Sequence, residues 1–210
     1  MEEHFRKDYK QIQIEEVTYY YDTITFPESY QAIYGCEGGE VAKFPAMIEN
    51  LPVMTLCSNE SFLGQGFTCK KAIVAEGIKT ITQQSFYNNS YIEELILPES
   101  LEILGWQSFA CCSRLKSVSM SQKHLIKFVT AFKGSAQLQQ IKIYDNAKIY
   151  TGHELMSMIA YFYMILTKDR HQITLDKDET QLLSMCREYG WDNYIADYHQ
   201  EYNELFGRIS

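Results

Sequence analysis

Apolar residues in the middle of this chain recur with a period of about 23 residues. Four phenylalanines mark the period at spacings of 24, 23 and 23 residues: Phe62, Phe86, Phe109 and Phe132. A period of this length is typical of stacked repeats, in which each unit needs its neighbours to bury its apolar side chains. The pattern therefore predicts a short solenoid.

The clearest unit is ELILPESLEILGWQSFACCSRLKS, residues 94–117. Its apolar positions are Leu95, Leu97, Leu101, Leu104, Phe109 and Leu115, and the preceding unit matches them with Ala72, Val74, Ile78, Ile81, Phe86 and Ile92. In the third unit, His124 and Lys127 occupy two of the apolar positions, which predicts a degenerate repeat. A fourth unit begins at Ile141 and Ile143 and then stops repeating.

The alternating pair that opens each unit predicts a strand of three or four residues. A helical or irregular turn is expected to follow it and to carry the phenylalanine. Stacking would align the strands into a parallel sheet and the phenylalanines into an internal column. The expected fold class is an α/β solenoid with small parallel strands.

The phase of these strands selects one candidate surface. If the alternating apolar residues point inward, the residues between them point outward on a continuous sheet face. These outward residues are Lys71, Ile73, Glu94, Ile96, Ser117, Ser119, Gln140 and Lys142. Ile73 and Ile96 would lie side by side as an apolar pair. This pair is either a binding patch or a pair that the N-terminal segment or a C-terminal helix covers, and an exposed isoleucine can also be without function.

From about Thr151 the apolar period becomes helical. Thr151 and Glu154 fit a capping box, and Leu155, Ile159, Phe162 and Leu166 follow at helical spacing. Two further helix starts are expected at Asp176 and Asp192. The chain therefore divides into an N-terminal segment (1–18), a repeat domain (19–148) and a helical C-terminal cap or interaction region of two to three helices (149–210).

Composition narrows the class of protein. The 210 residues are 46% apolar and 22% charged, which is ordinary for a folded domain. The net charge is −8 and no Lys/Arg run is long enough to follow a phosphate backbone, so a nucleic-acid partner is not expected. The longest apolar run, residues 155–166, is too short to span a bilayer. Tyr19, Tyr20 and Tyr21 are consecutive, so we expect some of them to be exposed.

Candidate catalytic chemistry is sparse. The five histidines are scattered and no CxxC pair occurs among the six cysteines, so neither a metal site nor a cofactor is expected. Cys111 and Cys112 are adjacent, but side chains of neighbouring residues diverge, which favours inert packing. An enzyme would require His153, His171 or Cys186 to meet carboxylates such as Asp176 or Glu179 at the junction between the repeats and the helices.

Several segments resemble the BspA-type leucine-rich repeat family. The stretches LILPESLEIL and SFACCSRL match its repeat closely, with Cys112 in the cysteine position, and GCEGGEVAKFPAMIENLPVMTLCSNESF looks like its entry unit. The resemblance covers roughly residues 19–148. It implies a solenoid and, from many relatives, a surface or secreted adhesion protein.

The leading functional hypothesis is a non-enzymatic interaction protein whose outward strand face or helical end binds another protein. The alternative is a cell-surface adhesion or carbohydrate-binding protein, as the resemblance implies, and an enzyme comes third. The N-terminus lacks the apolar region of a secretory signal. A cytoplasmic location is therefore expected, with the extracellular surface as the alternative.

Overall fold

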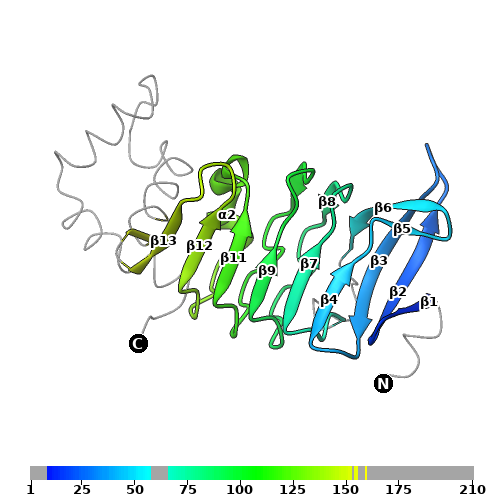
Figure 1. The fold of residues 1–210 in the computed structure, drawn as a ribbon, viewed down its shortest axis with the longest axis horizontal. Coiled ribbons are helices and arrows are strands. Elements are labelled where there is room, and N and C mark those ends of the chain that lie inside the picture. Colours follow the sequence, from blue (N-terminus) through cyan, green and yellow to red (C-terminus); the bar gives the residue numbers. More distant parts are fainter. Residues whose placement is uncertain (1–8, 58–65, 153, 156–158, 160–210) are drawn as a thin grey trace.

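Two sheets lie back to back along the molecule in the computed structural model, which describes residues 9–57, 66–152, 154–155 and 159. The front sheet has the order β13-β12-β11-β9-β7-β4 and faces the viewer in Figure 1. Its strands are β4 (Val41–Phe44), β7 (Lys71–Val74), β9 (Glu94–Ile96), β11 (Ser117–Met120), β12 (Gln140–Ile143) and β13 (Ile149–Thr151).

The rear sheet has the order β1-β2-β3-β6-β8-β10, with β5 paired to β6. Its strands are β1 (Lys10–Ile14), β2 (Val17–Ile24), β3 (Tyr30–Glu37), β5 (Met47–Ile48), β6 (Leu51–Leu56), β8 (Thr80–Ile81) and β10 (Ile103–Leu104). The turns that begin with β4, β7 and β9 thus each contribute one strand to the front sheet and one to the rear sheet, namely β6, β8 and β10. The predicted solenoid with parallel strands is confirmed.

The register of the front sheet follows the sequence repeat. Strands β7, β9, β11 and β12 are parallel, and each residue pairs with the residue 23 positions later, as Leu95 does with Val118. Inward residues such as Leu95, Val118 and Ile141 have no exposed surface. The predicted strand phase is therefore correct.

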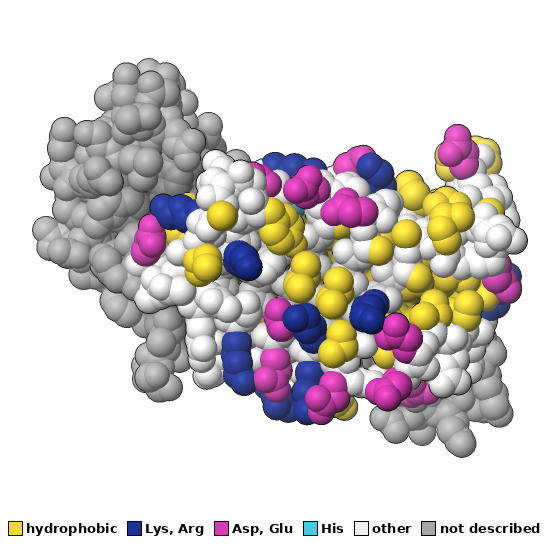
Figure 2. Space-filling model, viewed as in Figure 1, with side chains coloured by type: hydrophobic (Ala, Val, Ile, Leu, Met, Phe, Trp, Pro, Cys, Tyr) yellow, Lys and Arg dark blue, Asp and Glu magenta, His cyan; other side chains and the backbone are white. Residues whose placement is uncertain are grey.

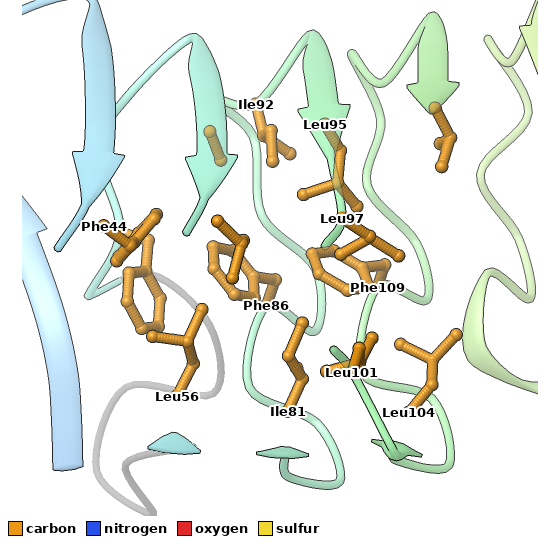
Figure 3. Close-up of a cluster of buried hydrophobic side chains, with 14 of the residues drawn as sticks. Phe44, Leu56, Ile81, Phe86, Ile92, Leu95, Leu97, Leu101, Leu104 and Phe109 are labelled. Atoms are coloured by element: carbon orange, nitrogen blue, oxygen red, sulfur yellow. The ribbon is translucent and has the colours of Figure 1, made fainter. Parts of the chain in front are cut away.

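Stacked phenylalanine rings form a column between the sheets (Figure 3). Ring centroids lie 4.7 Å apart for Phe86 and Phe109, and 5.0 Å apart for Phe109 and Phe132. On the N-terminal side, the ring that stacks on Phe86 is Phe67, at 4.1 Å. Phe62, which the constant period selects for this place, lies outside the described residues. Phe44 contacts Phe67 and Phe86 edge to face and closes the column.

Three residues after Phe86, Phe109 and Phe132, a side chain donates a hydrogen bond to the backbone of the preceding turn. The Asn89 amide donates to the Phe67 carbonyl (2.7 Å), the Cys112 thiol to the Phe86 carbonyl (3.2 Å) and the Ser135 hydroxyl to the Phe109 carbonyl (2.8 Å). These three donors are buried and occupy one position of the repeat. The residue at the cysteine position of the repeat thus hydrogen-bonds to the backbone of the preceding turn. This structural role agrees with the prediction that Cys112 is inert.

The third unit departs from the others because it forms helix. Within the described part of the chain, the two continuous helices are the 3-10 helix η1 (Gln122–His124) and α2 (Leu125–Ala131). Helix α2 turns Lys127 to the solvent and buries Phe128, whose ring stacks on Phe132 at 4.5 Å. In the turns that begin with β7 and β9, the chain instead forms irregular turns and one short rear strand, β8 or β10. The α/β expectation is therefore corrected to a solenoid of strands and turns.

An antiparallel hairpin system covers the N-terminal end of the solenoid. Strand β1 pairs with β2, β2 pairs with β3, and β3 joins the repeats through β6. Strand β2 crosses the boundary expected between residues 18 and 19. The expectation that some of Tyr19, Tyr20 and Tyr21 would be exposed is wrong, since all three are buried. The pairing register shifts between Tyr20 and Tyr21, and the Tyr20 hydroxyl bonds to the Glu37 carboxylate.

At the C-terminal end, Leu155 and Ile159 are helical and are buried in the same apolar cluster as the repeats. Their spacing of four residues places both on one face of a helix. The further helices expected after this point, from residue 160 onward, lie outside the described residues.

Candidate interaction surface

The eight residues predicted for the outward strand face do lie on one surface, the solvent side of the front sheet. Parallel pairing aligns Lys71, Glu94, Ser117 and Gln140 in one row. A second row, two residues further along each strand, consists of Ile73, Ile96, Ser119 and Lys142. We call this surface the outward strand face.

Contacts between neighbouring strands hold the first row in register. The Lys71 ammonium lies 2.9 Å from the Glu94 carboxylate. The Gln140 amide donates to the Ser117 hydroxyl at 3.0 Å. Both pairs join positions that the backbone register already sets opposite each other, so they are cross-strand pairs of the kind that stabilises a sheet.

The second row contains the apolar part of the face. Ile73 and Ile96 are paired directly and each is partly exposed, so neither is fully covered by another part of the protein. Strand β4 extends the face beyond the predicted residues, because Val41 pairs with Lys71 and Lys43 with Ile73. Val41 is 40% exposed. The sequence signal for β4 is the alternation in VAKF, but its pairing offset of 30 residues falls outside the 23-residue period.

Tyr144 changes the expected role of Ser119. The Tyr144 hydroxyl reaches back across the sheet and bonds to the carbonyls of Leu97 and Ser119, the latter at 2.9 Å. Burial raises the pKa of Tyr144 to about 12, so the hydroxyl remains a donor at neutral pH. Ser119 is only 8% exposed. It is therefore not available as the exposed hydroxyl expected from the sequence.

A network of ion pairs borders the face where the strands begin. We call this the charged margin: Glu40, Lys70, Glu93, Arg114 and Lys116. Glu40 pairs with Lys70, and Glu93 pairs with both Arg114 and Lys116. The hydrogen bond from Lys116 lowers the pKa of the Glu93 carboxyl. Figure 2 shows charged side chains of both signs gathered along the lower edge and apolar side chains across the centre, with Lys or Arg side chains among them.

Carboxylates also border the opposite edge of the face, where the strands end. Asp145 accepts from the backbone amide of Gln122 at 2.7 Å and from the Ser121 hydroxyl at 2.9 Å, and these bonds lower its pKa. Glu76 accepts from the backbone amides of Glu99 and Ser100. The apolar centre therefore lies between two polar borders.

The residues that an enzyme would require all lie outside the described residues: His153, His171, Asp176, Glu179 and Cys186. Within the part of the chain that the structure describes, no three His, Cys, Asp or Glu side chains gather to hold a metal ion. The described residues also contain no helix long and apolar enough to cross a membrane.

Comparison with known proteins identifies the repeats. Residues 55–157 match the model of the BspA type leucine rich repeat region, in six copies. No curated protein is significantly similar to the chain.

Two solved structures show a distant likeness. The T. pallidum leucine rich repeat protein is 17% identical with a TM-score of 0.39, over 64% of this chain and 72% of its own. The pneumococcal vaccine antigen PcpA is 16% identical with a TM-score of 0.30, over 65% of this chain and 41% of its own. Neither likeness is close enough to carry a conclusion about function.

Proposed function

Because residues 55–157 of this chain belong to the BspA-type leucine-rich repeats, we propose that it is a non-enzymatic binding protein whose outward strand face engages another protein. Solenoids of stacked repeats use such continuous surfaces for recognition. The function proposed here rests on this face and not on the residues that follow 159.

One observation carries the proposal. Ile73 and Ile96 form a partly exposed apolar pair on neighbouring strands of the front sheet, and charged groups border that sheet where its strands begin and where they end. An apolar centre with a polar rim is the usual anatomy of a protein–protein interface. The front sheet supplies a rigid backbone, so little conformational entropy is lost when a partner binds.

Affinity purification from the native cell, followed by binding measurements with the partner it recovers, tests the proposal. The double variant Ile73→Asp/Ile96→Asp introduces two charges at the apolar centre. We expect it to bind the partner at least about tenfold more weakly, because charges would have to be buried in the interface. The matched control is Ile103→Asp, which changes a 56% exposed isoleucine of the rear sheet.

The two new aspartates would lie directly opposite each other and could disturb the sheet. A second double variant, Ile73→Lys/Ile96→Glu, removes the same apolar pair but places opposite charges across the strands. Circular dichroism and the melting temperature establish that each variant is folded. Folded variants that retain every partner at wild-type affinity would eliminate the outward strand face as the binding site.

A further inference from the structure

Two cysteines from separate segments meet where the N-terminal hairpins join the repeats. Cys36 lies in β3 and forms an isolated parallel bridge with Phe67. The Cys36 amide donates to the Gly66 carbonyl at 2.8 Å, and the Thr68 amide donates to the Cys36 carbonyl at 3.0 Å. These two bonds fix the segment before Cys69 alongside Cys36.

Both thiols point into the same part of the core. Cys36 and Cys69 have no exposed surface and belong to one buried cluster. The side chains of Cys36 and Cys69 interact, and this interaction together with burial raises the pKa of Cys36. The same interaction lowers the pKa of Cys69.

The other described cysteines are placed differently. The Cys112 thiol donates to the Phe86 carbonyl, and Cys111 is its direct neighbour in the chain. Burial raises the pKa of Cys57 to about 11, and its hydrogen bond with Tyr34 opposes this rise. Among the described thiols, only Cys36 and Cys69 therefore combine separate segments, mutual contact and full burial.

We propose that Cys36 and Cys69 are a redox pair that forms a disulfide when the chain folds in the presence of a disulfide oxidant. Before the two thiols are buried, the thiolate of one cysteine attacks one sulfur of the oxidant and releases one thiol. The second cysteine then loses its proton, attacks the sulfur of the first cysteine in this mixed disulfide and releases the second thiol. Two protein thiols become one disulfide, and one oxidant disulfide becomes two thiols.

The bond would join the N-terminal hairpins to the first turn of the solenoid. It closes the loop that contains β4, β5 and β6, and closing a loop restricts the unfolded chain. The oxidised protein should therefore resist detachment of this end. The outward strand face does not include either cysteine, so the redox pair and the proposed binding function can fail independently.

Refolding the full chain in a buffer of oxidised and reduced glutathione tests the pair. Free thiols are then alkylated, and the protein is cleaved after Lys and Arg. Cys36 falls in the peptide 11–43 and Cys69 in the peptide 44–70, which also contains Cys57. The experiment is therefore done on Cys57→Ser as well, where a link between these peptides can only be the predicted one.

We expect the linked peptides to be the main oxidised product and the melting temperature to rise by about 5 °C over the reduced protein. Cys36→Ala and Cys69→Ala should each abolish the rise, whereas Cys57→Ser should keep it. If an alanine variant does not fold, peptide mapping of Cys57→Ser decides alone. Free Cys36 and Cys69, or a different main pairing such as one with Cys111, would overturn the proposal.

Discussion

His124 is the residue at which this repeat departs most from its own pattern. It is 4% exposed and occupies the position that Ile78 and Leu101 fill in the turns before it. Within the described structure, its Nε2 atom is buried and has no hydrogen-bond partner. A buried polar atom without a partner destabilises the folded state by about 1–3 kcal/mol.

Replacement of His124 by leucine restores the residue type of the neighbouring turns. We expect His124→Leu to increase the free energy of unfolding by about 1 kcal/mol at pH 7, because it removes the unpaired atom and adds apolar burial. Urea denaturation measures this change. The control is Gln122→Leu, an exposed position two residues earlier in the same 3-10 helix, which should leave the stability nearly unchanged.

The same histidine should make stability depend on pH. Burial, reinforced by Lys123 and opposed by Asp145, lowers the pKa of His124 below its ordinary value of 6.5. As the pH falls through 6.5, the unfolded chain binds the proton before the folded chain does, so stability decreases towards the folded pKa. The free energy of unfolding of His124→Leu should therefore decrease less than that of the wild type between pH 7 and pH 5. Identical pH profiles for variant and wild type would contradict the assignment.

Asn89 makes the most extensive of the three tethers between turns. Besides its bond to Phe67, it accepts from the backbone amides of Tyr91 and Ile92, each at 2.9 Å. Asn89→Ala leaves buried backbone groups unpaired and should cost about 3 kcal/mol. Cys112→Ser, by contrast, keeps a donor towards Phe86 and should cost less than Cys112→Ala. Chemical denaturation of the three variants gives the order.

At the scale of the elements, close contact between successive turns depends on Gly105. A Cβ atom here would lie 2.4 Å from the backbone nitrogen of Gln83 and the carbonyl carbon of Thr82. Gly105→Ala should therefore push two turns apart and destabilise the protein by more than about 2 kcal/mol. Gly77→Ala is the informative comparison, since its Cβ meets no atom within 4 Å and only its positive φ of 100° is unfavourable. We expect a cost of about 1 kcal/mol for Gly77→Ala, measured by the shift in melting temperature.

The elements that could be predicted are those that repeat. The 23-residue period sets the strand phase, so it correctly places all eight candidate residues on one face. Strand β4 pairs at a different offset, and Phe67 replaces the expected phenylalanine next to Phe86, so the period misses both. Tyr144 reaches two turns back to Leu97, a contact that no local pattern encodes. The period also does not predict helix α2, because the apolar residues of this segment follow the spacing of a helix and not that of the repeat.

At the scale of the whole molecule, a solenoid has two open ends, and described residues beyond the repeats join the core at each of them. The hairpins β1 to β3 cover one end, and Leu155 and Ile159 join the core at the other. In a stack of this kind each turn contacts mainly its neighbours, so stability is approximately a sum of local terms. Loss of a cover should therefore loosen the nearest turn first.

The variant Ile159→Asp tests whether the loss of one end loosens only the nearest turn. A charge at this buried position should open the C-terminal end and speed amide hydrogen exchange in β12, while exchange in β7 and β9 stays near the wild-type rate. Thr151→Asp adds the same charge at an exposed residue nearby and should change neither. Equal acceleration in all the strands would show that the solenoid unfolds as one cooperative unit. No acceleration in β12 would show that Ile159 does not support the last turn. The expected gradient in exchange rates would leave Ile73 and Ile96 on the strands that are most protected from exchange. A binding surface on these strands keeps its shape even when the ends of the solenoid open.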